Sequence, residues 1–111
     1  MRNAVIVDSV RTGLAKSFRG GFNNTRADNM TAHIVNALLE RNPEVDASMV
    51  EDIILGCGNP EGAQGHNIAR NVAILSKLPI EAALPNVYVL QGHPFSFNHF
   101  ILSKLPFLAA S

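Results

Sequence analysis

The sequence predicts an α/β fold, in which strands and helices alternate along the 111-residue chain. Short apolar runs rich in β-branched residues occur at 4–7 and 53–55, as in strands covered on both faces, and a third strand candidate covers 86–90. The two stretches between these runs repeat their apolar residues with a helical period. A glycine-bearing loop after the second run leads into a helix, which is the order of a βαβ unit with parallel strands.

The first predicted strand, residues 4–7, is followed by a polar connection that contains several cations. This connection carries Lys16, Arg19 and Arg26 within a short length of chain. Two interpretations remain open: the loop contacts an anion, or it is a solvated loop with scattered cations, and we expect the second.

A helix is predicted next. Thr25 and Asp28 fit a capping box at its start, because the hydroxyl and carboxylate can each accept from free backbone N–H groups of the first turn. His33 lies beside the expected inward stripe and is expected to be a surface or packing histidine. Asn42 and Pro43 are expected to end the helix. The predicted stripe consists of Ala27, Met30, Ile34, Ala37, Leu38 and Arg41.

The second strand, 53–55, is the centre of the predicted unit. Asp46 is expected to cap a short turn before it, from which Met49 and Val50 pack inward. Beyond the strand, glycines 56, 58, 62 and 65 permit positive φ and close backbone approach. They do not form G-x-G-x-x-G with a following acidic residue, so dinucleotide binding is not indicated.

A second helix should follow the glycine loop. Asn67 is expected to cap this helix, and Pro79 is expected to end it. Its predicted apolar positions are 68, 72 and 75, with Ala69 and Ala73 beside them.

Composition excludes several classes of protein. Hydrophobic residues make up 47% of the chain, and nine basic residues balance nine acidic ones without a clustered patch, so neither nucleic acid nor a membrane surface is expected as a partner. The apolar runs are far shorter than the roughly 20 residues that cross a bilayer. The first strand begins almost at Met1, which leaves no room for a signal peptide, and we expect a cytoplasmic protein.

Cys57 is the chain's only cysteine, which excludes an internal disulfide and a cysteine-rich zinc site. At the end of a buried strand it is expected to be an inert core residue. A metal site assembled from Cys57, His93 and His99 would match no recurrent ligand spacing, so none is expected.

Residues 3–80 resemble the amino-terminal part of the thiolases, which include acetyl-CoA acetyltransferases and 3-ketoacyl-CoA thiolases. The order and spacing of six stretches carry this resemblance. They are AVIVDSVRT at 4–12, FRGG at 18–21, RAD at 26–28, ALLERNP at 37–43, VEDIILGC at 50–57 and GHNIAR at 65–70. Gly13 stands where the family usually has proline, and His66 where glutamine or methionine is common.

The resemblance implies an incomplete βαβαβ portion of one thiolase half. Residues 1–91 would form this partial amino-terminal domain, and 92–111 a divergent, irregular tail. The implied reaction is acyl transfer between coenzyme A thioesters through a cysteine thioester. It implies acyl-CoA as substrate, no further cofactor, and association with a thiolase subunit or a second copy.

The resemblance fails after Glu81. Thiolases continue with a strand ending in a pattern like Thr-Val-Asn-Arg-x-Cys-Ser-Ser-Gly, whose cysteine begins a helix and takes the acyl group. A helix amino terminus favours the thiolate that this chemistry needs. Here the corresponding residues are YVLQG, at 88–92. We therefore assign no catalytic, cofactor-binding or metal-binding residue and expect the chain alone to be inactive.

Two further functional interpretations and the origin of the tail stay open. The chain can be a non-catalytic partner that docks on full-length thiolase subunits, or an unrelated small-ligand-binding βαβ domain. The tail can be a frameshifted end, a different last exon, or the natural end of a short paralogue.

Overall fold

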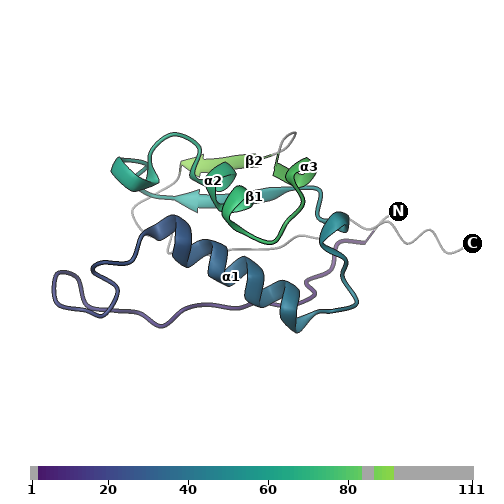
Figure 1. The fold of residues 1–111 in the computed structure, drawn as a ribbon, viewed down its shortest axis with the longest axis horizontal. Coiled ribbons are helices and arrows are strands. Elements are labelled where there is room, and N and C mark those ends of the chain that lie inside the picture. The colour runs from purple at the N-terminus through teal and green to yellow at the C-terminus, as the bar shows by residue number, and fades with distance from the viewer. Residues whose placement is uncertain (1–2, 84–86, 92–111) are drawn as a thin grey trace, which may run out of the picture.

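The computed structural model describes residues 3–83 and 87–91. Helix α1 spans Ala27–Arg41, and strand β1 spans Ile53–Cys57 after a 3-10 turn at Ala47–Met49. A second 3-10 turn at Gly62–Gln64 precedes helix α2. The remaining elements are α2 at Ile68–Leu75, α3 at Ile80–Ala83 and β2 at Val87–Gln91 (Figure 1).

The two strands form a parallel pair, in register from Ile53 opposite Val87 to Cys57 opposite Gln91. The strands predicted at 53–55 and 86–90 are therefore confirmed: β1 begins where predicted and extends two residues further, and β2 is displaced by one residue. Helix α2 and the short α3, which was not predicted, lie in the connection between them. A connection of this kind is what parallel neighbours require.

The strand predicted at 4–7 is wrong, because residues 3–16 form no helix or strand. Figure 1 shows this part of the chain along α1, on the side away from the two strands. Asp8 explains the placement: its Oδ2 accepts a hydrogen bond from Asn42 Nδ2 at 3.0 Å, and its Oδ1 lies 3.2 Å from Arg41 Nη2. Residue 8 is thereby held at the carboxyl end of α1, whereas a strand of a βαβ unit ends level with the start of the following helix.

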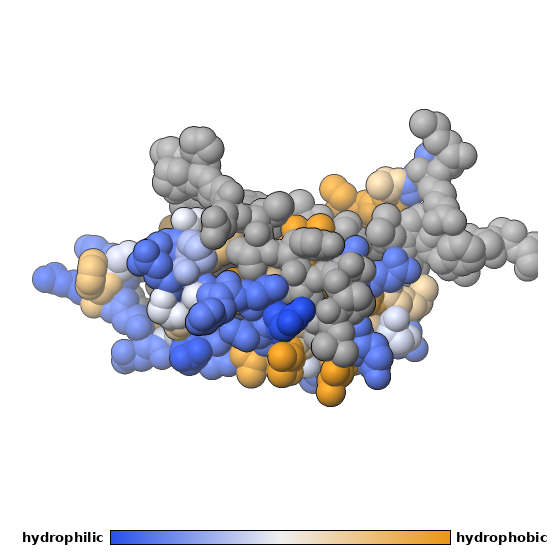
Figure 2. All heavy atoms as spheres, turned by 90° about the horizontal axis from the view of Figure 1, so that it is seen from above, coloured by the Kyte–Doolittle hydropathy of each residue, from blue (hydrophilic) through white to orange (hydrophobic). Residues whose placement is uncertain are grey.

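Several large apolar side chains of the described residues are exposed. Among the coloured residues of Figure 2, orange apolar atoms form separate groups at the margins of the face instead of one continuous patch. By exposure, the large apolar side chains that face solvent come from the amino-terminal segment, the polar connection, β1 and the later helices. The exposed large apolar residues are Val5, Ile6, Val7, Leu14, Phe18, Phe22, Ile54, Ile74, Leu75 and Ile80.

Helix α1 confirms the predicted element but shifts its inward stripe. Ile34 and Leu38 are buried as expected, whereas Met30 is only half-buried. Thr31 and Val35, one turn apart, complete the buried face together with Ala32. The helix ends as predicted, and the Asn42 backbone N–H donates to Leu38 O and Leu39 O.

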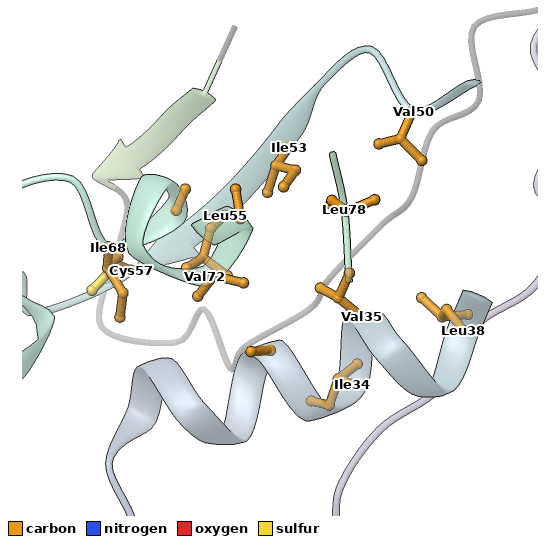
Figure 3. Packing of buried hydrophobic residues seen from close by; sticks show 13 residues of the cluster. Ile34, Val35, Leu38, Val50, Ile53, Leu55, Cys57, Ile68, Val72 and Leu78 are labelled. Carbon is orange, nitrogen blue, oxygen red and sulfur yellow. The ribbon is translucent and has the colours of Figure 1, made fainter. Parts of the chain in front are cut away.

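The core lies between the two helices and one face of β1 (Figure 3). Ile53, Leu55 and Cys57 point from β1 toward Val35 of α1 and Val72 of α2, and all five are at most 2% exposed. Alternation along the strand turns Ile54 the other way, where it is 38% exposed. The expectation that this strand is covered on both faces is therefore wrong for the described part of the chain.

The second predicted helix is confirmed, with one error in its stripe. Asn67 is the cap, its side chain accepting from Arg70 N, and the Ile68 and Val72 side chains are buried. Leu75 is 48% exposed because α2 ends there, with Ser76 as its C-cap, before the chain reaches Pro79. Val50 packs into the core as predicted, and Asp46 caps the turn before it by accepting from Ser48 N.

No helix within 3–83 and 87–91 is long and apolar enough to cross a membrane. The predicted tail at 92–111, including His93 and His99, lies outside the described residues, so the division at residue 91 stays a prediction.

Candidate functional site

The carboxyl end of β1 and the loop to α2 form the candidate site, because this is where the only thiol meets the glycine-bearing loop. Cys57 is the last residue of β1 and is 2% exposed. Its Sγ donates to Gln64 Oε1 at 3.3 Å, and Ile68 of α2 lies beside it (Figure 3). The thiol is thus enclosed by the strand, the loop and the first turn of α2, as expected for a core cysteine.

The loop is folded by two residues with positive φ. Gly62 has φ 57°, and His66, one residue before the α2 cap, has φ 56°. The backbone of a residue other than glycine is strained at such a φ, so His66 keeps this conformation only because the surrounding structure imposes it. Gly65 allows a close approach of the backbone, because a Cβ there would lie 3.0 Å from Gly62 O and would require the loop to shift. The expectation that the loop glycines permit positive φ and close backbone approach thus holds at Gly62 and Gly65. The positive φ of His66 was not predictable from its residue type.

Cys57 and His66 do not form a nucleophile–base pair as the structure stands. The thiol is buried, whereas His66 is exposed at the start of α2. In the described part of the chain no group of three histidine, cysteine, aspartate or glutamate residues could hold a metal ion. The loop therefore holds the Cys57 sulfur in a buried position, and His66 is not placed to take the proton of that thiol.

The start of α1 holds a buried carboxylate that is paired with an arginine. Asp28, 4% exposed, accepts from Arg26 Nε at 3.1 Å and from Arg26 Nη2 at 2.8 Å. This hydrogen bond lowers the pKa of Asp28, against the opposing effect of burial. The predicted capping box of Thr25 and Asp28 is wrong. The N-cap residue is Arg26, whose side chain makes no capping hydrogen bond, and the Asp28 carboxylate accepts instead from the Arg26 side chain and from Asn29 N.

This pairing bears on the predicted cation loop. Arg26 is engaged by Asp28, which raises the pKa of Arg26. Lys16 and Arg19 are exposed on the turn that precedes α1. Of the three cations considered for anion contact, Arg26 is thus paired with a carboxylate of the chain itself.

A shallow depression of about 410 Å³ lies between this loop and the outer side of α1. No sequence motif indicates this depression, because the residues that line it come from three separate stretches of the chain. His33 borders it and is exposed, as expected of a surface histidine. The other residues that line it are Thr12, Gly13, Phe22, Thr25, Asn29 and Met30.

The depression lacks the means for acyl transfer. Its hydroxyl, amide and imidazole groups can donate and accept hydrogen bonds, and Phe22 and Met30 provide apolar contact. It contains neither a thiol nor a carboxylate. The buried thiol at the end of β1 therefore remains the only group in the described residues with the chemistry that the thiolase resemblance implies.

Comparison with known proteins identifies the chain's relatives. Residues 4–89 match the family described as thiolase, N-terminal domain, so the match includes most of β2, beyond the resemblance found at 3–80. The 3-ketoacyl-CoA thiolase of Aliivibrio salmonicida is 47% identical over 87 residues, which cover 78% of this chain and 22% of the relative. The enzyme of the same name from Vibrio parahaemolyticus is 49% identical over 80 residues, which cover 72% and 20%. The chain thus spans about a fifth of the length of the curated relatives it matches.

Proposed function

The chain belongs to the thiolase family, whose amino-terminal domain it matches over residues 4–89, and we propose that it descends from an acyltransferase that moves acyl groups between coenzyme A thioesters. We further propose that these 111 residues alone do not catalyse the transfer. The proposed substrates are acyl-CoA thioesters, and no other cofactor is invoked. A cytoplasmic location also remains a prediction.

The burial of Cys57 carries the proposal of inactivity. Acyl transfer through a thioester requires a thiolate that can reach the acyl carbon, together with a group that accepts the thiol proton. Cys57 is the chain's only cysteine, and its sulfur is enclosed at the end of a strand with its S–H directed at Gln64 Oε1. The amide oxygen of Gln64 does not act as a base near neutral pH, so it cannot take the thiol proton. Close packing around the sulfur also leaves no space for an acetyl group on it.

The assay is thiolysis of acetoacetyl-CoA. In the reaction to be tested, a cysteine sulfur would lose its proton and bond to the acetoacetyl C3 carbon. The C2–C3 bond would then break with its electron pair on C2, and C2 would take up a proton to leave as acetyl-CoA. Free coenzyme A would finally take the acetyl group from the cysteine sulfur, and its thiol proton would restore the cysteine thiol. We expect no acetyl-CoA formation by the purified chain and no acetylated Cys57 by mass spectrometry. Turnover that Cys57→Ser abolishes would overturn the proposal, because it would make Cys57 a working nucleophile.

A second candidate function is docking on an intact thiolase subunit. The open face of β1, where Ile54 is exposed, supports this candidate, because a second protein could cover the apolar side of the strand that the described residues leave open. Gel filtration of the chain mixed with purified 3-ketoacyl-CoA thiolase tests this function. Co-elution that Ile54→Asp weakens would support it, and separate elution at high protein concentration would contradict it.

A further inference from the structure

The depression on the outer side of α1 has the size of a small-molecule site. Its volume of about 410 Å³ lies within the range of pockets that hold small ligands. Asn29 and His33 are both exposed and lie four residues apart on α1, so their side chains are neighbours on the helix surface. Asn29 bonds to Asp28 through its backbone N–H, so its side-chain amide can serve a ligand. The depression therefore offers donors and acceptors side by side.

Phe22 and Met30 give the same depression an apolar side. Phe22 is 40% exposed, and Met30 is half-buried. A flat ring gains contact energy by lying against an aromatic side chain, and stacking of this kind accepts any base. The amide and imidazole groups of Asn29 and His33 can bond the polar edges of such a ring. The lining thus fits a heteroaromatic ring with polar edges.

Uncompensated positive charge lies on the connection that closes the depression. Arg11, Lys16 and Arg19 belong to this connection, and all three are exposed. None of the three forms an ion pair within the part of the chain that the structure describes. The nearest carboxylates along the chain, Asp8 and Asp28, are bonded to other residues. Exposed guanidinium and ammonium groups without a carboxylate partner favour a phosphate.

We propose that the depression binds a nucleoside monophosphate, with its base against Phe22 and Met30 and its phosphate on Lys16 and Arg19. The ring and the phosphate are needed together, because either one alone leaves the apolar side or the cations without a partner. The depression lies on the outer side of α1, whereas Cys57 points into the core on the inner side of that helix. The proposal therefore does not depend on acyl transfer.

Titration of the isotope-labelled chain with adenosine monophosphate, followed by two-dimensional NMR, tests the proposal. We expect the amide signals of Gly13, Asn29 and His33 to shift to saturation. Adenosine and inorganic phosphate should each bind at least about tenfold more weakly than the nucleotide, because each lacks one of the two sets of contacts. No shift at millimolar nucleotide, shifts confined to other parts of the chain, or equal binding of adenosine or phosphate alone would each overturn the proposal.

Two substitutions at exposed positions separate the two halves of the proposed ligand. Phe22→Ala should weaken the binding of both adenosine and adenosine monophosphate, because the ring contact is lost. Lys16→Gln should weaken only the nucleotide, by about threefold, as expected for one exposed charge pair. Lys77→Gln is the matched control, since Lys77 is an exposed cation paired with Glu40, and it should change neither affinity.

The spectra of these variants also show whether α1 keeps its fold, so loss of binding through unfolding is recognised. Nucleotide affinity equal to that of the wild type in either folded variant, Phe22→Ala or Lys16→Gln, would overturn the proposal. An equal loss in Lys77→Gln would also overturn it, because it would show that the charge on the connection has no special role.

Discussion

At the scale of single residues, the pairing of charged groups decides how the chain is arranged. Asp28 is buried at the start of α1 and is satisfied by Arg26, and Asp8 binds the far end of the same helix through Arg41 and Asn42. Residue type alone predicted a capping role for Asp28, because a carboxylate in a first turn can serve either the backbone or a nearby arginine. The competition between these partners is decided by tertiary packing and cannot be read from the motif.

Replacing Asp28 with alanine should destabilise the fold by about 1–2 kcal/mol, since the charge-assisted bonds from Arg26 are lost while the exposed guanidinium can turn to water. Urea unfolding followed by circular dichroism measures the change. Glu61→Ala, at an exposed loop position, is the control and should change stability by less than about 0.5 kcal/mol. Equal effects of the two substitutions would contradict the role of the buried pair.

Stability should also fall in acid. Hydrogen bonds lower the pKa values of Asp8, Asp28, Glu40 and Asp46, the partners being Asn42, Arg26, Lys77 and the Ser48 backbone in turn. A carboxylate with a lowered folded-state pKa stabilises the fold above its unfolded pKa of about 4, and this contribution disappears as pH falls through the folded value. We expect the unfolding free energy to decrease between about pH 5 and pH 2, with a shallower decrease in Asp28→Asn. A flat profile over that range would contradict the carboxylate pairing.

At the scale of elements, local signals predicted α1, β1, α2 and β2, and non-local contacts decided the rest. Asn67 identified the start of α2 because a cap acts within three residues of itself. Residues 4–7 have the composition of a strand, but their position depends on Asp8 binding residues more than thirty positions away. Nothing local indicates that contact. The burial of Cys57 was predictable from the apolar strand before it, whereas its bond to Gln64 depends on how the loop folds.

Helix α2 should depend on its cap. Replacing Asn67 with alanine removes the acceptor for Arg70 N, at 3.2 Å, and should cost about 1 kcal/mol of stability. Asn71→Ala, at an exposed position within the same helix, is the matched control and should be nearly neutral. The two variants are compared by urea unfolding, and an equal loss in both would contradict the capping role.

At the scale of the whole molecule, the described residues build a core on one side of β1 and leave the other side open. The thirteen buried apolar residues come from α1, β1, α2 and their flanks, and they pack against the face that carries Ile53, Leu55 and Cys57. A domain with one covered sheet face has little stability in reserve, because small cores barely offset the entropy of folding. Its integrity therefore depends on each large residue of that one layer.

Leu55→Ala should remove about 2–5 kcal/mol, since Leu55 is 2% exposed between the two helices. Because that loss approaches the whole stability of a small domain, we expect loss of cooperative unfolding by circular dichroism. Leu14→Ala, at a position 83% exposed, should leave the transition unchanged.

The central claim is that this thiolase-family chain keeps its only thiol as part of the core and not as a nucleophile. The rate at which an aromatic disulfide reagent modifies Cys57 tests it directly, measured in buffer and again in denaturing urea. We predict slow modification in buffer, limited by opening of the structure, and rapid modification in urea. Modification in buffer as fast as in urea would contradict the claim, because it would show an accessible, reactive thiol at the end of β1.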